Sequence, residues 1–313
     1  MDVNADGMKD ILTGSFSGVP QWVVNSKDGY GEPTAVVDKN GDLVAISTFW
    51  DFEADDWAES DRSGTTGFCS SVAAVDWDHD GDMDLLLGGY REGGLFLRLN
   101  EGSATETKFA TTNQPVKVGD QPIAFEGGIG APRVVDWDGD GLFDIVIGSI
   151  YGEVVLFRNT GTKGSPKFSE RTTLVELLPG KSGSKQIKRV QGKDGAPVAP
   201  GSSFHIELVD YDGDDDLDLL VGGRSEWLTG PEKSPTAEDL EHKKQLIEKR
   251  DAAWAKFRDY QKTVTGEEAL KELKSTEKYR TLLADYHSIR REAYAVTADP
   301  VERGDFLWLF RRK

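Results

Sequence analysis

Four nine-residue segments of this chain place acidic side chains at alternate positions, a spacing that suits a hard metal cation. Each follows the pattern Asp-x-(Asp/Asn)-x-Asp-x-x-x-Asp, and a short apolar run comes after it. Calcium takes six to eight oxygen ligands at about 2.3 to 2.6 Å, and a short loop supplies them from alternate residues around a sharp turn. The pattern therefore predicts four calcium loops, at residues 2–10, 76–84, 136–144 and 210–218, which we number first to fourth.

The predicted ligands of each loop are the side chains at positions one, three, five and nine and the backbone carbonyl at position seven. We expect up to four Ca²⁺ ions, one in each loop. The carbonyls belong to Met8, Asp82, Leu142 and Asp216. The side-chain ligands are Asp2, Asn4, Asp6 and Asp10 in the first loop; Asp76, Asp78, Asp80 and Asp84 in the second; Asp136, Asp138, Asp140 and Asp144 in the third; and Asp210, Asp212, Asp214 and Asp218 in the fourth.

Glycine occupies position six in three of the loops, where the chain must turn sharply. Gly7, Gly81 and Gly141 can adopt a left-handed backbone at little cost because they carry no Cβ atom. The fourth loop has Asp215 at this position, and aspartate tolerates the conformation better than most residues do. We expect the fourth site to be weakened or reshaped rather than lost, with metal binding there left open.

The loops differ from EF-hands, which need a bidentate Glu at position twelve and a helix on each side. Position twelve is Thr13, Leu87, Ile147 or Val221, and the flanking residues are rich in Val and Leu, as in strands. The loops are therefore predicted to join β-strands. Because Asp and Gly are common in turns, the alternative is four polar turns without metal. Four copies in one register favour the metal sites.

The acidic composition restricts the classes of partner. The net charge is −18, and 18 of the 55 acidic residues lie in the four loops. We expect no binding to nucleic acid or to anionic membranes, because both carry negative charge. No apolar run is long enough for a transmembrane helix, so membrane insertion is not expected. Cys69 is the only cysteine, which excludes an intrachain disulfide.

The spacing of the loops suits a repeated four-stranded unit. In the third unit, strands are predicted at residues 132–137, 144–148 and 153–159, and a fourth strand begins near Phe168. The metal loop lies between the first two of these strands. Residues 301–313 are predicted to return as a strand of the last unit, because they repeat the apolar pattern of the earlier third strands.

Two motifs carry a family resemblance. A metal loop is followed by a strand such as LLLGG at residues 85–89, and a later strand ends in a sequence such as RNTG at residues 158–161. This combination resembles the FG-GAP/VCBS repeat family, whose repeats form β-propeller blades similar to the integrin α-subunit head, with Ca²⁺ in the loop between the first two strands. The resemblance implies a mainly β fold, a β-propeller of four-stranded antiparallel blades, with about four blades in residues 1–231 as part of a larger ring.

Residues 232–300 differ from the rest in composition, which changes to Glu, Lys, Ala and Leu. They are predicted to form an inserted antiparallel helical hairpin, with helices at residues 235–264 and 267–294. Two apolar stripes are expected to face each other: Leu240, Ile247, Trp254, Phe257 and Val264 on the first helix, and Leu270, Leu273, Leu282, Tyr286, Ile289 and Ala293 on the second.

No catalytic motif is found in the sequence. His79 is expected to be exposed at the fourth position of its loop, and His205 is expected to pack within a strand. Residues 50–61 mix carboxylates with aromatics, as sugar-binding grooves do, although a solvated loop is the simpler interpretation. The Arg-Gly-Asp at residues 303–305 is interpreted as the turn into the returning strand. These observations favour a protein that is not an enzyme, although the sequence does not exclude enzymatic activity.

The sequence predicts a calcium-stabilised β-propeller module that binds a protein or a glycan at the cell surface or outside the cell, where millimolar Ca²⁺ fills such loops. A secreted, periplasmic or cell-surface location is expected. No signal peptide is found, but the chain begins inside its first loop, which indicates a fragment. The alternative is the propeller domain of a carbohydrate-active enzyme of the polysaccharide lyase or sugar dehydratase type. An incomplete ring is expected to self-associate through exposed blade faces.

Overall fold

The computed structural model describes residues 2–4, 6–15, 18–46, 48–51, 56–59, 69–91, 93–125, 127–176, 199–229, 233–298 and 301–312. The chain divides into two compact units. One is a β unit, Met1–Glu226 together with Arg303–Lys313, and the other is a helical unit, Trp227–Glu302. Each unit is described by itself. No helix in the described ranges is both long and apolar enough to cross a membrane.

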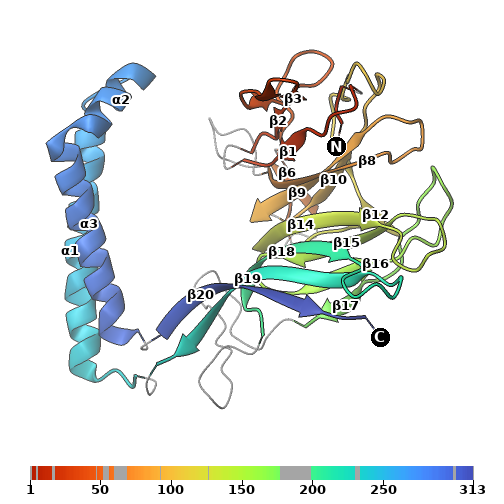
Figure 1. Cartoon of the computed structure of the whole chain (residues 1–313). Helices are drawn as coiled ribbons and strands as arrows, with labels where there is room; N and C mark the ends of the chain where they lie inside the picture. The colour runs from red at the N-terminus through yellow and green to blue at the C-terminus, as the bar shows by residue number, and fades with distance from the viewer. Residues whose placement is uncertain are drawn as a thin grey trace. The chain divides into compact units, whose positions relative to one another are not determined.

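The β unit consists of small antiparallel sheets, and two of those in the described residues have four strands (Figure 1). The first sheet contains β1 (Ile11–Thr13), β2 (Gln21–Val23) and β5 (Thr34–Ala35); the second contains β8 (Cys69–Val75), β9 (Asp84–Arg91), β10 (Leu95–Arg98) and β11 (Gln114–Pro115); the third contains β14 (Gly127–Val135), β15 (Asp144–Ser149), β16 (Val154–Phe157) and β17 (Thr172–Val175); and the fourth contains β18 (Ser202–Val209), β19 (Asp218–Leu228) and β20 (Val301–Phe310).

Short pairings add to these sheets. The second and third sheets are joined where Gly127 and Gly128 of β14 pair with the end of β9. Three two-stranded sheets also form: β3 (Asn25–Ser26) with β4 (Gly29–Tyr30), β6 (Thr48–Asp51) with β7 (Asp56–Glu59), and β12 (Lys117–Val118) with β13 (Gln121–Pro122).

The prediction of a mainly β fold with four-stranded units is confirmed. In the third unit, the three strands expected before Phe168 are β14, β15 and β16, and β17 follows that residue. Phe168 also bridges back to Asn159 beyond the end of β16. The described residues do not show closure of these sheets into a ring.

The apolar runs in β9 and β15 are continuous because both faces of their sheets are covered. In β9, Leu85 and Leu87 belong to a buried cluster shared with the first sheet, whereas Leu86 belongs to a cluster shared with the third sheet. In β15, Val146 faces a cluster shared with the fourth sheet, and its two neighbours face the second sheet. Since successive side chains of a strand point to opposite faces, the sheets of this unit stack face to face in chain order.

A glycine at the end of each apolar run allows the next sheet to approach closely. A Cβ atom on Gly88 of β9 would lie 2.7 Å from the side chain of Ile129 in the third sheet. A Cβ atom on Gly148 of β15 would lie 2.9 Å from the side chain of Ile206 in the fourth sheet. Larger residues would therefore push neighbouring sheets apart.

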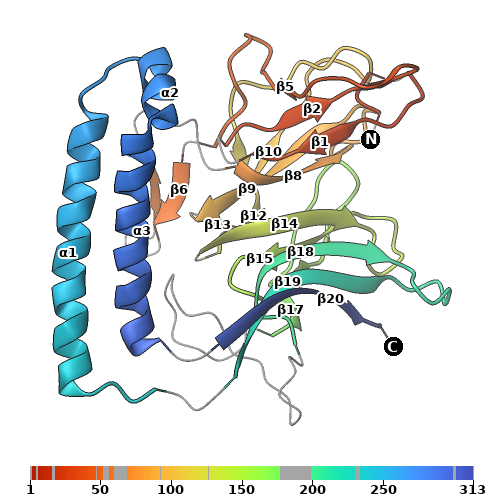
Figure 2. The same cartoon turned by 60° about the vertical axis from the view of Figure 1, so that its left-hand side comes forward.

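The fourth sheet is completed by the strand that follows the helical unit. β20 lies beside β19 in the order β18-β19-β20 (Figure 2). The interpretation of residues 303–305 as a turn is wrong, because the extended strand continues through them. Asp305 is tied to the neighbouring strand by Arg224, whose Nε atom lies 3.2 Å from its carboxylate.

The helical unit contains three helices in its described part: α1 (Ala237–Gln261), α2 (Glu267–Ser275) and α3 (Glu277–Thr297). A capping box starts α1, in which the Thr236 side chain accepts from the Asp239 N–H and the Asp239 side chain accepts from the Thr236 N–H. The second predicted helix is divided at Thr276. This residue ends α2 with an extended backbone and caps α3 by accepting from the Tyr279 N–H.

Helices α1 and α3 lie side by side and run in opposite directions (Figures 1 and 2). The Lys243 ammonium near the start of α1 donates to the Thr297 hydroxyl at the end of α3, at 2.5 Å. At the other end of α1, the Tyr260 hydroxyl lies 3.4 Å from the Thr276 hydroxyl. The predicted antiparallel arrangement of the long helices is therefore present.

Aromatic rings form the contact between the two long helices. Trp254 lies 4.8 Å from Tyr286, and Phe257 meets Tyr279 edge to face at 5.0 Å. The predicted stripe on α1 needs one correction. Leu240 is 55% exposed, whereas Leu246, which the predicted stripe did not include, is buried.

Replacing Phe257 by Ala should destabilise the helical unit by about 3 kcal/mol, because the ring is buried and the substitution leaves a cavity between the helices. The loss would be measured as a lower urea midpoint of the helical circular dichroism signal. Leu240→Ala is the matched control and should change the midpoint little. Equal effects of the two substitutions would contradict the packing described.

Candidate metal centres

The second, third and fourth acidic loops connect the first and second strands of their sheets, the first loop precedes β1, and internal hydrogen bonds fix the shape of the loops. In the third loop, the Asp136 carboxylate accepts from the N–H groups of Gly139 and Gly141, at 2.8 and 2.9 Å. The Asp140 carboxylate accepts from the Leu142 N–H at 2.8 Å. These bonds hold the side chains at positions one and five against the backbone of the loop itself.

The aspartate at position nine is buried in every loop and joins the loop to the end of the third strand. Asp10, Asp84, Asp144 and Asp218 are at most 5% exposed. Their Oδ2 atoms accept from the N–H of position two, and their Oδ1 atoms accept from the N–H of a residue just beyond β2, β10, β16 or β20, which take the third-strand place in the four units. The donors to Oδ2 are the N–H groups of Val3, Trp77, Trp137 and Tyr211, at 2.7 to 3.2 Å. The donors to Oδ1 are the N–H groups of Asn25, Asn100, Asn159 and Arg312, at 2.7 to 2.9 Å.

We call this pair of bonds the aspartate clamp. Sequence reasoning assigned position nine only as a metal ligand and missed the clamp. In the fourth sheet, the two partners of the clamp are separated in the sequence by the helical unit, because Asp218 accepts from the N–H of Arg312, which follows β20. The same bond in the third sheet is made by Asn159, only a short hairpin away. β20 thus takes the third-strand place in the fourth sheet.

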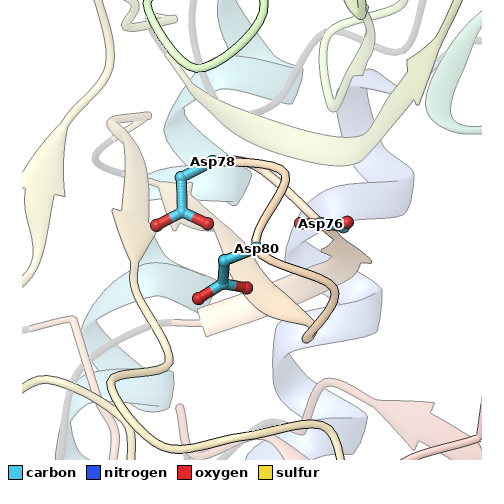
Figure 3. Close-up of side chains that lie close together, drawn as sticks. All are labelled: Asp76, Asp78 and Asp80. Carbon is cyan, nitrogen blue, oxygen red and sulfur yellow. The ribbon is translucent and has the colours of Figure 1, made fainter.

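Three of the loops bring three carboxylates close enough to share one cation. In each triad, one oxygen per residue lies within 4.8 Å of the others. Figure 3 shows the triad of the second loop, with Asp78 and Asp80 on the loop and Asp76 at the end of the preceding strand. The triads are Asp76, Asp78 and Asp80; Asp136, Asp138 and Asp144; and Asp210, Asp212 and Asp214.

The first loop is built differently. Its Asn4 side chain donates to the Asp6 carboxylate at 3.2 Å, and its Oδ1 atom accepts from the Asp6 N–H. Among the described residues, the carboxylates of this loop form no triad of the kind found in the other three. The position-nine clamp on Asp10 is nevertheless present.

The second loop contains buried carboxylate oxygens that lack hydrogen bonds. Among the described residues, Asp76 Oδ1 and Asp82 Oδ1 are buried and have no hydrogen-bond partner. Asp82 is only 3% exposed, and burial, followed by repulsion from Asp80 and Asp78, raises its pKa to about 6. Burial likewise raises the pKa of Asp84 to about 6, although its clamp bonds oppose the shift. Buried oxygens without partners suit a bound cation.

Two positions of each triad loop adopt a left-handed backbone, and the sequence indicated only one of them. Position six does so as predicted, and the non-glycine Asp215 has φ of 69° there. Position four does so as well, at Gly139, Gly213 and His79, whose φ is 62°. A non-glycine residue in this region costs of order 1 kcal/mol or more. Glycine at position four of the third and fourth loops is the sequence signal for this second left-handed residue, and sequence reasoning missed it.

The histidine of the second loop contacts the third loop. His79 is exposed, as predicted, and its ring stacks on Phe143 at 5.2 Å. Trp77, at position two of the same loop, lies 5.9 Å from Phe168 in the third sheet. The rings at positions two and four of the second loop therefore pack against Phe168 and the third loop.

Two other predicted features have different outcomes. The expectation that His205 is packed is wrong: it is exposed on β18, because Phe204 and Ile206 on either side point into the core. The aromatic and acidic segment at residues 50–61 lies mostly outside the described residues. Its described parts are the backbones of β6 and β7, which pair with each other.

Comparison with known families identifies a repeat in the middle of the chain. Residues 136–221 match the FG-GAP-like repeat. The match begins at the third loop, includes the fourth, and confirms the family resemblance of this segment. A search of curated proteins finds no match to the chain.

The clamp predicts a difference between two aspartates of the third loop. Asp144→Asn should lower the free energy of unfolding by about 2 to 3 kcal/mol in excess EDTA, because an amide nitrogen would face a buried N–H donor. Asp138→Asn, at a more exposed position, should lower it by less than about 1 kcal/mol. Urea denaturation measures both values. A loss for Asp144→Asn as small as that for Asp138→Asn would show that the clamp does not stabilise the metal-free protein.

The raised pKa values of Asp82 and Asp84 predict an unusual pH dependence for the metal-free protein. Their ordinary pKa of 3.8 applies to the unfolded chain, so between pH 6 and 4 the folded state binds more protons. Stability in EDTA should therefore rise by about 1 to 3 kcal/mol as the pH falls from 7 to 5. Asp82→Asn should reduce this rise, and denaturation at several pH values provides the measurement. A steady loss of stability over the same range would refute the prediction.

Proposed function

We propose that the β unit binds Ca²⁺ in its acidic loops and that the bound ions stabilise the ends of its stacked sheets. The convergence of three aspartates in each of the second, third and fourth loops carries this proposal. Oxygen donors at that spacing suit a hard cation, and Ca²⁺ accepts flexible oxygen geometry. The partnerless oxygens of Asp76 and Asp82 support the same ligand.

Electrostatic repulsion gives the cation its stabilising role. Two carboxylates about 4 Å apart repel each other by roughly 4 kcal/mol at an effective dielectric constant near 20. The second, third and fourth loops each join two strands of one sheet, so repulsion in such a loop opposes the pairing of those strands. A divalent cation replaces the repulsion by attraction, and a site filled at 100 times its dissociation constant adds about 2.7 kcal/mol of stability.

We further propose that this unit is a non-enzymatic module that binds a protein or a glycan outside the cell. The FG-GAP-like repeat at residues 136–221 and the acidic loops support this class of protein. Short acidic loops of this kind are filled at millimolar Ca²⁺, which is typical of extracellular modules. A secreted, periplasmic or cell-surface location follows from the same argument.

Removing calcium should destabilise the β unit strongly. Excess EDTA should lower the melting temperature by at least about 10 °C relative to millimolar CaCl₂, because several sites are emptied at once. Calorimetry measures the melt. The control is the triple variant Asp78→Asn, Asp138→Asn, Asp212→Asn, which should melt at the same temperature in both buffers. The same melting temperature for the unmodified protein in both buffers would disprove calcium binding.

Ligand binding should depend on the same ions. Screening the protein on a glycan array in millimolar CaCl₂ and in EDTA tests the glycan class of partner directly. We expect glycan signals that disappear in EDTA and in the triple variant, because the loops order the ends of the sheets. Equal signals in all three conditions would show that glycan binding does not depend on the metal sites.

A further inference from the structure

Two arginines lie beside acidic loops at equivalent places in their repeats. Arg158 Nη1 is 3.2 Å from Asp138 Oδ2 in the third loop, and Arg311 Nη1 is 3.4 Å from Asp212 Oδ2 in the fourth. Both aspartates occupy position three and belong to a triad. Each arginine directly precedes the residue that donates to the aspartate clamp. The repeat therefore directs both guanidinium groups to the same ligand position.

The second loop has no such group. The equivalent residue is Leu99, which packs against the core cluster between the second and third sheets. Within the described residues, no ion pair involves any of the five aspartates of this loop. The loop also contains the additional buried carboxylate of Asp82, which the third loop replaces by Leu142. Its negative charge is thus the least compensated of the three triads.

The fourth loop has a second compensating charge. Arg312 Nη1 is 3.3 Å from Asp216 Oδ1, and it also donates to the Trp137 carbonyl at 2.6 Å. Its guanidinium lies over the Trp137 ring, 5.1 Å from the ring centre. The ring and the carbonyl of Trp137 hold this guanidinium in place, so it stays next to the fourth loop whether or not metal is bound.

A fixed positive charge beside a cation site has two opposite effects. In the metal-free loop it attracts the carboxylates and reduces their mutual repulsion. Once a divalent cation is bound, the guanidinium repels it and competes for the same oxygen of position three. The charge therefore stabilises the metal-free loop and weakens metal binding.

We propose that Arg158 and Arg311 are internal counter-cations that lower the Ca²⁺ affinity of the third and fourth loops, so that the second loop fills before them. This inference rests on the proposed function, namely that the loops bind Ca²⁺. The third and fourth loops keep their shape at low Ca²⁺, whereas the second depends on the ion. The protein then responds to Ca²⁺ over a wide range of concentration.

The tryptophans at position two allow metal binding to the second and third loops to be measured separately. Trp77, Trp137 and Tyr211 stand next to the first ligand of the second, third and fourth loops. A bound Tb³⁺ ion, which uses the same oxygen ligands as Ca²⁺, emits when a nearby tryptophan is excited. Trp77→Phe leaves the tryptophan signal of the third loop, and Trp137→Phe leaves that of the second. Competition with Ca²⁺ then provides the dissociation constant of each loop.

In the full chain carrying Trp77→Phe, Arg158→Gln should raise the Ca²⁺ affinity of the third loop about three- to tenfold. Arg158→Lys should keep the affinity low, since it keeps the charge. Arg171→Gln is the matched control: Arg171 pairs with Glu153 and with no aspartate of the acidic loops, so its loss should leave the Ca²⁺ affinity unchanged. In the unmodified protein, the second loop should fill at a lower Ca²⁺ concentration than the third.

An unchanged or weaker affinity after Arg158→Gln, or a third loop that fills before the second, would overturn the proposal. The melting temperature in EDTA supplies a second test, because Arg158→Gln should lower it and Arg171→Gln should do so less. Failure of the proposed function is distinguishable: in that case neither Tb³⁺ emission nor Ca²⁺ competition would be seen in the unmodified protein.

Discussion

Each repeat buries one carboxylate where its loop, its second strand and the end of its third strand meet. The cost of burying this charge is offset by two N–H donors, one from the loop and one from beyond the third strand. Because both oxygens are held, the start of the loop and the end of the third strand are fixed to the same side chain. The clamp therefore couples the loop geometry, on which a metal site depends, to the pairing of the strands, on which the sheet depends.

The same clamp explains how the fourth sheet accommodates a large insertion. A third strand is identified in this fold by its place beside the second strand and by the N–H that it presents to the buried aspartate. β20 satisfies both conditions although the helical unit precedes it, since Arg312 donates to Asp218. Only a backbone N–H is required, so arginine can replace the asparagine of the other repeats. Its side chain is then available for Asp216 and Trp137.

Regular sequence patterns predicted most of the fold, and features that depend on tertiary contacts were missed. The acidic spacing, the apolar runs and the helix signals predicted the loops, the strands and the long helices. The division of the second helix at Thr276 depends on one capping hydroxyl, and the exposure of His205 depends on which face of β18 meets its neighbour. The clamp was missed because an aspartate at position nine has the same sequence signature as a ligand and as a buried acceptor.

The loops also show how repeats with one motif can differ in their chemistry. Position three is aspartate in the second, third and fourth loops, yet the residue before the clamp donor is an arginine paired with it in two of them and a leucine packed on the core in the other. That residue lies at the end of a strand in a different part of the sequence, so the motif alone gives no information about it. The electrostatic environment of each loop is therefore set by the third strand of its sheet, through the same chain segment that completes the clamp.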